Sequence, residues 1–225
     1  MYQGVQCRSV GEPVLFLDNP DGMNRDLRQA SINAINEVNK QKGKACFANN
    51  VLLARKLVEK GVRFVQLFDW GWDSHGTEAS LAIDIGLLLL LRFRRRTDKA
   101  VTALLLDLKQ RGLLDETLVI WGGEFGRTPM QENRENKKNP FKGRDHHVEC
   151  FTIWMAGGGI KRGFSYGETD EIGYAPINGK VSVHDVHATI LHQLGFDHEK
   201  FIYQFQGRPF RLTDVAGEVI REIVA

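Results

Sequence analysis

The run Val62-Arg63-Phe64-Val65-Gln66-Leu67-Phe68, followed two residues later by Gly71-Trp72-Asp73-Ser74-His75-Gly76, bears most directly on the fold of this chain. The first part reads as a buried strand, and the second sets a carboxylate and an imidazole among glycines. The same order recurs at Thr117 to Trp121, which precedes Gly122-Gly123-Glu124-Phe125-Gly126-Arg127. In open α/β sheets, ligands bind beyond the carboxyl ends of the strands. The two stretches therefore predict neighbouring strand ends that contribute to one site.

Helical patterns alternate with these strand patterns along the chain. We expect helices over Arg25 to Gln41, Ala45 to Glu59 and Ala79 to Arg111, and a further one opening at Ser182. Ser182 and Asp185 have the spacing of a capping box. Alternating strands and helices with short links predict an α/β fold, with a mainly parallel sheet flanked by helices. A length of 225 residues suits a single domain over residues 1–225.

The bulk composition excludes several classes of protein. Thirty basic and 28 acidic residues give a net charge of +2, so the whole chain offers no case for nucleic-acid binding. The longest apolar run, Leu87 to Leu91, falls far short of the roughly 20 residues that span a bilayer. No export signal is visible at Met1, so the chain itself is expected in the cytoplasm. Three widely spaced cysteines, Cys7, Cys46 and Cys150, form no zinc-ribbon motif.

The glycine-rich loops and a third segment, Gly143 to His147, predict a divalent-metal site. Its candidate ligands are Asp73, His75, Glu124, His146 and His147. Mixed carboxylate and imidazole ligands suit zinc or manganese better than calcium, which prefers oxygen alone. Arg127, Arg144 and Asp145 flank these ligands and are the candidates for binding an anionic substrate.

Each of these candidates also has a structural interpretation. Asp73 can cap the helix that follows it, with His75 at the surface. A carboxylate beyond a buried strand needs a partner, and Glu124 can find one in Arg127 instead of a metal. The basic residues of the loop from 131 to 144 can simply be solvated.

Several motifs together resemble one family. These are Val62 to Leu67, Gly71-Trp-Asp-Ser-His-Gly, Leu113-Leu-Asp-Glu-Thr-Leu-Val-Ile-Trp-Gly-Gly-Glu-Phe-Gly-Arg-Thr-Pro, Gly143-Arg-Asp-His-His and Ala156-Gly-Gly-Gly. They look like the carboxyl-terminal half of the bacterial "domain of unknown function 1501" family, which is related to sulfatases within the alkaline phosphatase superfamily. The resemblance runs from about Ala45 to the end, and residues 1–44 match poorly.

The resemblance implies a sulfatase-like, metal-dependent hydrolase of phosphate or sulfate esters. It implies that Asp73 and His75 hold one metal with His146 or His147, and that Glu124 holds the acidic position of a second set. The superfamily's early Asp ligand and its nucleophile have no counterpart here, so an amino-terminally truncated fold is expected. No residue is assigned as nucleophile. Relatives in the family are usually exported.

Two other functions stay open on the sequence alone. A non-catalytic protein could keep the fold and a metal for binding or assembly, and a defective gene product could have no independent function. Loss of the superfamily's first strand would leave part of the sheet uncovered, which predicts self-association.

Overall fold

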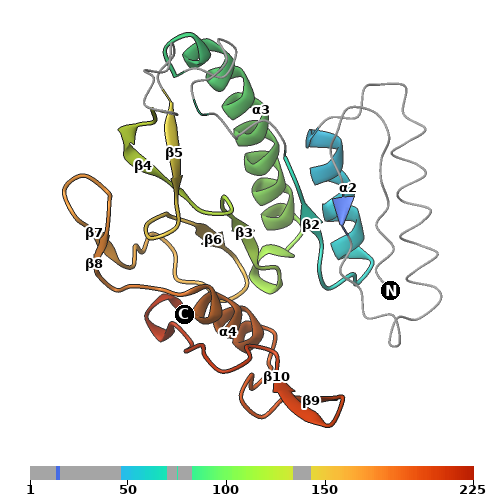
Figure 1. Ribbon diagram of the computed structural model, residues 1–225. Helices are drawn as coiled ribbons and strands as arrows, with labels where there is room; N and C mark the ends of the chain where they lie inside the picture. The colour runs from blue at the N-terminus through green and yellow to red at the C-terminus, as the bar shows by residue number, and fades with distance from the viewer. Residues whose placement is uncertain (1–13, 16–46, 70–74, 76–82, 134–142) are drawn as a thin grey trace. The chain divides into compact units, whose positions relative to one another are not determined.

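The computed structural model describes residues 14–15, 47–69, 75, 83–133 and 143–225. The chain forms two compact units. The first comprises Met1–Leu113 with Gln131–Arg144, and the second comprises Leu114–Met130 with Asp145–Ala225. Figure 1 shows both units and labels most of their helices and strands.

The described part of the first unit contains a pair of packed helices and one short sheet. Its elements are β1 (Val14–Leu15), α2 (Phe47–Glu59), β2 (Gln66–Leu67) and α3 (Ile83–Gln110). Helix α2 packs against α3, and β1 pairs with β2 in antiparallel register. The helices predicted over Ala45 to Glu59 and Ala79 to Arg111 are confirmed over Phe47–Glu59 and Ile83–Gln110, whereas the helix predicted over Arg25 to Gln41 lies outside the described residues.

The core of this unit forms where α2 runs into β2. Leu53 and Leu57 lie one helical turn apart and are almost completely buried, and Val62 joins them at the start of the following segment. Gly61 has a φ of 81°, and the N–H of Val62 returns to the carbonyl of Leu57 at 3.1 Å. A glycine in the left-handed region is the usual helix stop, and it turns the chain sharply enough to bring Val62 back onto the helix.

The second unit is made of short strands around one helix. Its regular elements are η2 (Leu114–Glu116), β3 (Val119–Trp121), β4 (Gly126–Gln131, whose last residue belongs to the first unit), β5 (Arg144–His147, whose first residue also does), β6 (Trp154–Ala156), β7 (Glu168–Thr169), β8 (Pro176–Asn178), α4 (Val183–Gln193), β9 (Ile202–Phe205), β10 (Arg208–Arg211) and η4 (Arg221–Ile223).

Helix α4 begins with the predicted capping box. The Ser182 hydroxyl accepts from the Asp185 N–H, and the Asp185 carboxylate accepts from the Ser182 N–H, so two helix-end donors are satisfied reciprocally. Thr189, fully buried, accepts from the Ile220 N–H at 3.0 Å and donates to the Asp185 carbonyl. The helix is thereby tied to the chain's carboxyl-terminal segment.

The predicted mainly parallel, sulfatase-like sheet is wrong. The described residues form five two-stranded sheets, in orders β1-β2, β10-β9, β3-β6, β4-β5 and β7-β8. The pairs β1-β2, β9-β10, β3-β6 and β7-β8 are antiparallel. Parallel neighbours require a crossover of a dozen or more residues, usually a helix. Between β3 and β6 the chain instead makes the β4-β5 pair and returns, so β6 runs back along β3.

The strands are also shorter than their apolar patterns suggested. The run Val62 to Phe68 contributes only Gln66–Leu67 as β2, and the apolar residue Val62 packs into the helix core instead. Among the described residues, no helix is both long and apolar enough to cross a membrane.

Candidate functional site

A buried histidine–glutamate pair in the first unit is the main candidate site among the described residues. His75 and Glu132 are 8% and 6% exposed, and His75 Nδ1 lies 2.8 Å from Glu132 Oε2. Glu132 directly follows β4, and its backbone N–H donates to the Gly143 carbonyl at 2.9 Å. Glu132 is thereby held at the start of the 131–144 segment, where its carboxylate contacts His75, 57 positions earlier in the chain.

The contact sets the roles of the two imidazole nitrogens. A carboxylate oxygen accepts, so Nδ1 carries the proton that it donates to Glu132, and the lone pair of a neutral ring then resides on Nε2. A carboxylate behind the protonated nitrogen also fixes the orientation of the ring. The pair therefore has the electronic arrangement of a metal-binding histidine or of a general base.

The predicted metal ligands lie in different parts of the chain. Asp73 lies outside the described residues. His75 belongs to the first unit, whereas Glu124, His146 and His147 belong to the second. Glu124 is exposed in a bend just after β3, so its carboxylate has solvent as an alternative to a metal. The single site that would unite all five residues remains a prediction.

The two histidines of β5 differ sharply in environment. The His147 side chain is buried, stacks on Tyr174 with ring centroids 4.5 Å apart, and has Nε2 2.5 Å from the Tyr174 carbonyl. Its Nε2–H donates there, leaving the lone pair on Nδ1. The exposed His146 makes an edge-on contact with Phe125 at 4.7 Å. The contacts of His147 give it a packing role within its own unit.

The candidate substrate-binding residues are more accessible. Arg144 and Asp145 are exposed on β5, and the Asp145 carboxylate accepts from the neighbouring His146 N–H at 2.8 Å. Arg127, on β4, is half-buried.

Glu132 was not among the residues singled out in the sequence. It sits in Gln131-Glu132-Asn133, at the start of a polar loop whose charges look solvated. The available signal was its position directly after Met130-Gln131, where a strand ends and a carboxylate becomes expensive to bury without a partner.

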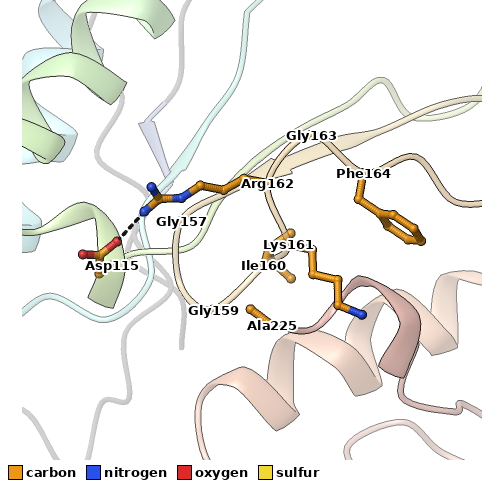
Figure 2. A pocket seen from close by; sticks show the side chains of 9 residues that line it. All are labelled: Asp115, Gly157, Gly159, Ile160, Lys161, Arg162, Gly163, Phe164 and Ala225. Atoms are coloured by element: carbon orange, nitrogen blue, oxygen red, sulfur yellow. Dashed lines mark hydrogen bonds and ion pairs between the residues drawn. The ribbon is translucent and has the colours of Figure 1, made fainter.

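A separate open pocket of about 520 Å³ lies within the second unit. Figure 2 shows the glycine turn after β6 along one side of it, with Lys161, Arg162 and Phe164 projecting from the following loop. Arg162 is paired with Asp115 at 2.9 Å, and the Lys161 ammonium donates to the Glu222 carbonyl at 2.8 Å. The pocket's cations thus already have partners within the chain.

The glycines of that turn are explained by packing. Gly157 and Gly158 have φ values of 73° and 48°, and an added Cβ would come within 2.3 Å of the Leu114 carbonyl and 2.7 Å of Leu118, respectively. The turn after β6 therefore requires glycine so that it can pass against the η2–β3 connection.

The comparison with protein families identifies the chain. The model described as "Protein of unknown function (DUF1501)" matches residues 40–224, and the chain belongs to this family. No curated protein and no solved structure gives a significant match.

Proposed function

We propose that this chain binds a divalent metal, zinc or manganese, through His75 with Glu132 behind it, and that this metal serves the hydrolysis of phosphate or sulfate esters. The observation that carries the proposal is the buried His75–Glu132 pair. A deeply buried carboxylate and imidazole in direct contact are costly to desolvate, which makes them candidates for a functional rather than an incidental pair.

The donor set favours metal binding over a simple ion pair. Metal-binding histidines almost always donate their second ring N–H to a carboxylate, carbonyl or water, and His75 has this arrangement through Glu132. Asp73 stands two residues before His75 in the sequence and would add a carboxylate oxygen. Nitrogen and oxygen donors together suit zinc or manganese.

The ester-hydrolase part of the proposal rests on the resemblance of the motifs to this family, which implies a relation to sulfatases. A bound metal would stabilise negative charge on a transferring phosphoryl or sulfuryl group. On this chain, Glu132 orients the His75 ring and keeps Nδ1 protonated, and the burial of the pair excludes water from the contact. Arg144, which belongs to the same unit as the pair, is proposed to attract the anionic ester.

A non-catalytic metal-binding or assembly protein is the second candidate. The exposed position of Glu124 favours it, because the superfamily's acidic position at a strand end is a ligand and not a solvated group. On this alternative, the metal would stabilise the first unit without any ester chemistry.

Metal binding is tested on the full chain by titration calorimetry and by metal analysis after dialysis. His75→Ala should abolish tight binding of zinc or manganese. Glu132→Gln, which keeps the side-chain volume, should weaken binding by about 10–100-fold, as is typical when the group behind a metal-binding histidine is lost. His187→Ala and Glu168→Gln, at exposed positions of the second unit, serve as matched controls and should bind like wild type.

Circular dichroism of the metal-free variants distinguishes lost ligation from lost folding. Equal affinity in wild type, His75→Ala and Glu132→Gln would overturn the metal assignment.

Hydrolysis is tested with p-nitrophenyl phosphate and p-nitrophenyl sulfate in the presence of the bound metal. Turnover that requires metal and is lost in Glu132→Gln, but kept in Glu168→Gln, supports the hydrolase. Metal binding with no turnover of either ester supports the non-catalytic alternative.

A further inference from the structure

The β9–β10 hairpin of the second unit presents an unusual sheet edge. Its strands pair in regular antiparallel register, with Phe205 opposite Arg208 and Ile202 opposite Arg211. The two loop residues, Gln206 and Gly207, have φ values of 49° and 79°. Two successive positive φ angles are those of a type I′ turn, whose twist matches that of paired strands. The hairpin is therefore a regular two-stranded ribbon.

The backbone groups on the outer edge of β9 can be assigned from this register. Bonded and non-bonded pairs alternate along an antiparallel ladder, and Pro209, opposite Gln204, has no N–H. The pair Gln204–Pro209 is thus a non-bonded one, and so is Ile202–Arg211, two residues on. The N–H and C=O groups of Ile202 and Gln204 consequently point away from β10. Among the described residues, β9 pairs with β10 alone.

The two edges of the hairpin are chemically opposite. On β10, Pro209 removes an outward donor and Arg208 and Arg211 bring charge, which are devices that natural proteins use to prevent edge pairing. The four residues of β9, Ile-Tyr-Gln-Phe, carry no charge and no proline, and all are exposed. One edge is thus protected and the other is competent to pair.

One face of the ribbon is also strongly aromatic. Tyr203 and Phe205 are 59% and 51% exposed and stack with their centroids 6.4 Å apart. Phe210, opposite Tyr203, shares this face, and the Arg208 guanidinium lies 4.4 Å from its ring centroid. Exposed aromatic surface beside an open strand edge is typical of an interaction site.

We propose that β9 pairs with β9 of a second copy of this chain, forming a four-stranded antiparallel sheet across the two copies. Outward-pointing residues must face outward-pointing residues, so Ile202 lies opposite Gln204 of the second copy, and Tyr203 lies opposite its own counterpart on the two-fold axis. The aromatic faces of the two hairpins then become continuous, and cross-strand aromatic pairs stabilise such sheets.

The outer edge of β9 is complementary to a second copy of itself, whereas the outer edge of β10 is not. In the same two-fold pairing through β10, Arg211 would lie opposite Pro209 of the other copy, and Pro209 has no N–H to complete the hydrogen bonds of that pair. Pairing through β9 brings no charge against another. The predicted self-association through an uncovered sheet is therefore assigned to the outer edge of β9, in the register given above.

The first experiment measures dimerisation by sedimentation equilibrium over micromolar to sub-millimolar concentrations. Gln204→Lys and Pro209→Lys are a matched pair, because the two residues face each other across the same hairpin. Gln204→Lys adds a charge at two symmetric positions of the proposed interface and should raise the dimer dissociation constant roughly tenfold. Pro209→Lys should leave it within about twofold. Adding Ile202→Glu to Gln204→Lys creates two opposite-charge pairs and should restore dimerisation.

The second experiment tests the register with single cysteines, in a chain whose three native cysteines are replaced by alanine. Tyr203→Cys places two thiols at a non-bonded antiparallel pair, with Cα atoms about 4.5 Å apart, within reach of a disulfide. It should cross-link on mild oxidation. Gln204→Cys is the control, since its two copies would lie about 8 Å apart along the diagonal.

A monomer throughout the concentration range overturns the proposal. So does a dimer that Gln204→Lys leaves intact and in which Tyr203→Cys does not cross-link. A monomer that instead binds an extended peptide at β9 would assign the edge to a strand from a different protein.

Discussion

At the scale of single residues, Asp185 shows how one carboxylate can serve two parts of a structure. It caps α4 through the Ser182 N–H, and its other oxygen accepts from the Glu218 N–H at 2.8 Å. Partial burial raises the pKa of this carboxyl, but the hydrogen bonds from Ser182 and Glu218 outweigh burial and hold the pKa below the ordinary value of 3.8. The ionised form is thus the one that the fold selects.

We predict that Asp185→Asn destabilises the protein by about 1–2 kcal/mol at neutral pH, because helix-cap and segment-anchoring bonds are weakened together. A carboxyl with a lowered folded-state pKa contributes stability above its unfolded pKa, and this contribution is lost as the pH falls through the folded value. The difference between wild type and variant should therefore shrink below about pH 4. Urea denaturation followed by circular dichroism at both pH values measures it. A difference that is constant with pH would contradict the assigned role.

Gly126 illustrates a second residue-scale constraint, close packing of backbone against backbone. A Cβ at this position would lie 2.1 Å from the Cys150 carbonyl oxygen, whereas at Gly123 the nearest atom would be 3.4 Å away. Backbone cannot rotate aside as a side chain can, so the strand itself would have to shift.

Gly126→Ala should therefore destabilise the second unit by about 1–3 kcal/mol, the usual cost of overpacking. Gly123→Ala is the matched control and should change stability by less than about 0.5 kcal/mol. Thermal unfolding of the two variants side by side provides the test, and equal effects would contradict a packing origin.

At the scale of elements, α2 and α3 are joined by a closed ring of four charges. Arg55 and Arg111 each contact both Glu59 and Asp107, with the Arg55–Asp107 and Arg111–Glu59 contacts at 2.7 Å running between the helices. The hydrogen bond from Arg111 is the largest influence on Asp107 and lowers its pKa, while the same contact raises the pKa of Arg111. The ring fixes the register of the two helices around their buried leucines.

The variant Asp107→Asn should unfold at a lower urea concentration than the wild-type protein at neutral pH, because Arg55 and Arg111 both lose the carboxylate that they contact. The lowered pKa means that this contribution is present above the unfolded pKa of Asp and disappears as the pH falls through the folded value. Molar salt should also reduce the difference, since the ring is largely solvent-accessible. Asp98→Asn, an exposed position on the same helix, provides the comparison and should leave the midpoint unchanged.

At the scale of the whole molecule, the proposed metal site and the proposed self-association edge belong to different units. The buried His75–Glu132 pair belongs to the first unit, and the open β9 edge belongs to the second. A ligand that binds only the folded state stabilises the part of the chain that it binds, by mass action. Metal and self-association should consequently protect different parts of the chain.

Hydrogen exchange of the full chain should show this separation. Zinc or manganese at saturating concentration should slow exchange in α2 and the first unit's core, and raising the protein concentration should slow it in β9. Equal protection of α4 by the metal would contradict a site confined to the first unit. No protection in either unit would contradict the metal proposal.

Local structure could be predicted from the sequence because its causes lie within a few residues. The bounds of α2 follow from its apolar spacing and from Gly61, and the start of α4 follows from Ser182 and Asp185. Membership of the family was likewise visible in contiguous motifs. His75 was recognisable because a histidine among glycines is unusual wherever the chain goes.

Strand pairing and the partner of His75 were decided by the tertiary structure. An apolar run such as Thr117 to Trp121 does not encode its neighbour, so it predicted a parallel sheet where β3 meets β6 in the opposite direction. Glu132 meets His75 across 57 residues, and its own surroundings in the sequence resemble any solvated loop. Local signals arise from steric and hydrogen-bonding limits inside one segment, whereas these contacts depend on how the chain returns to itself, which no single segment specifies.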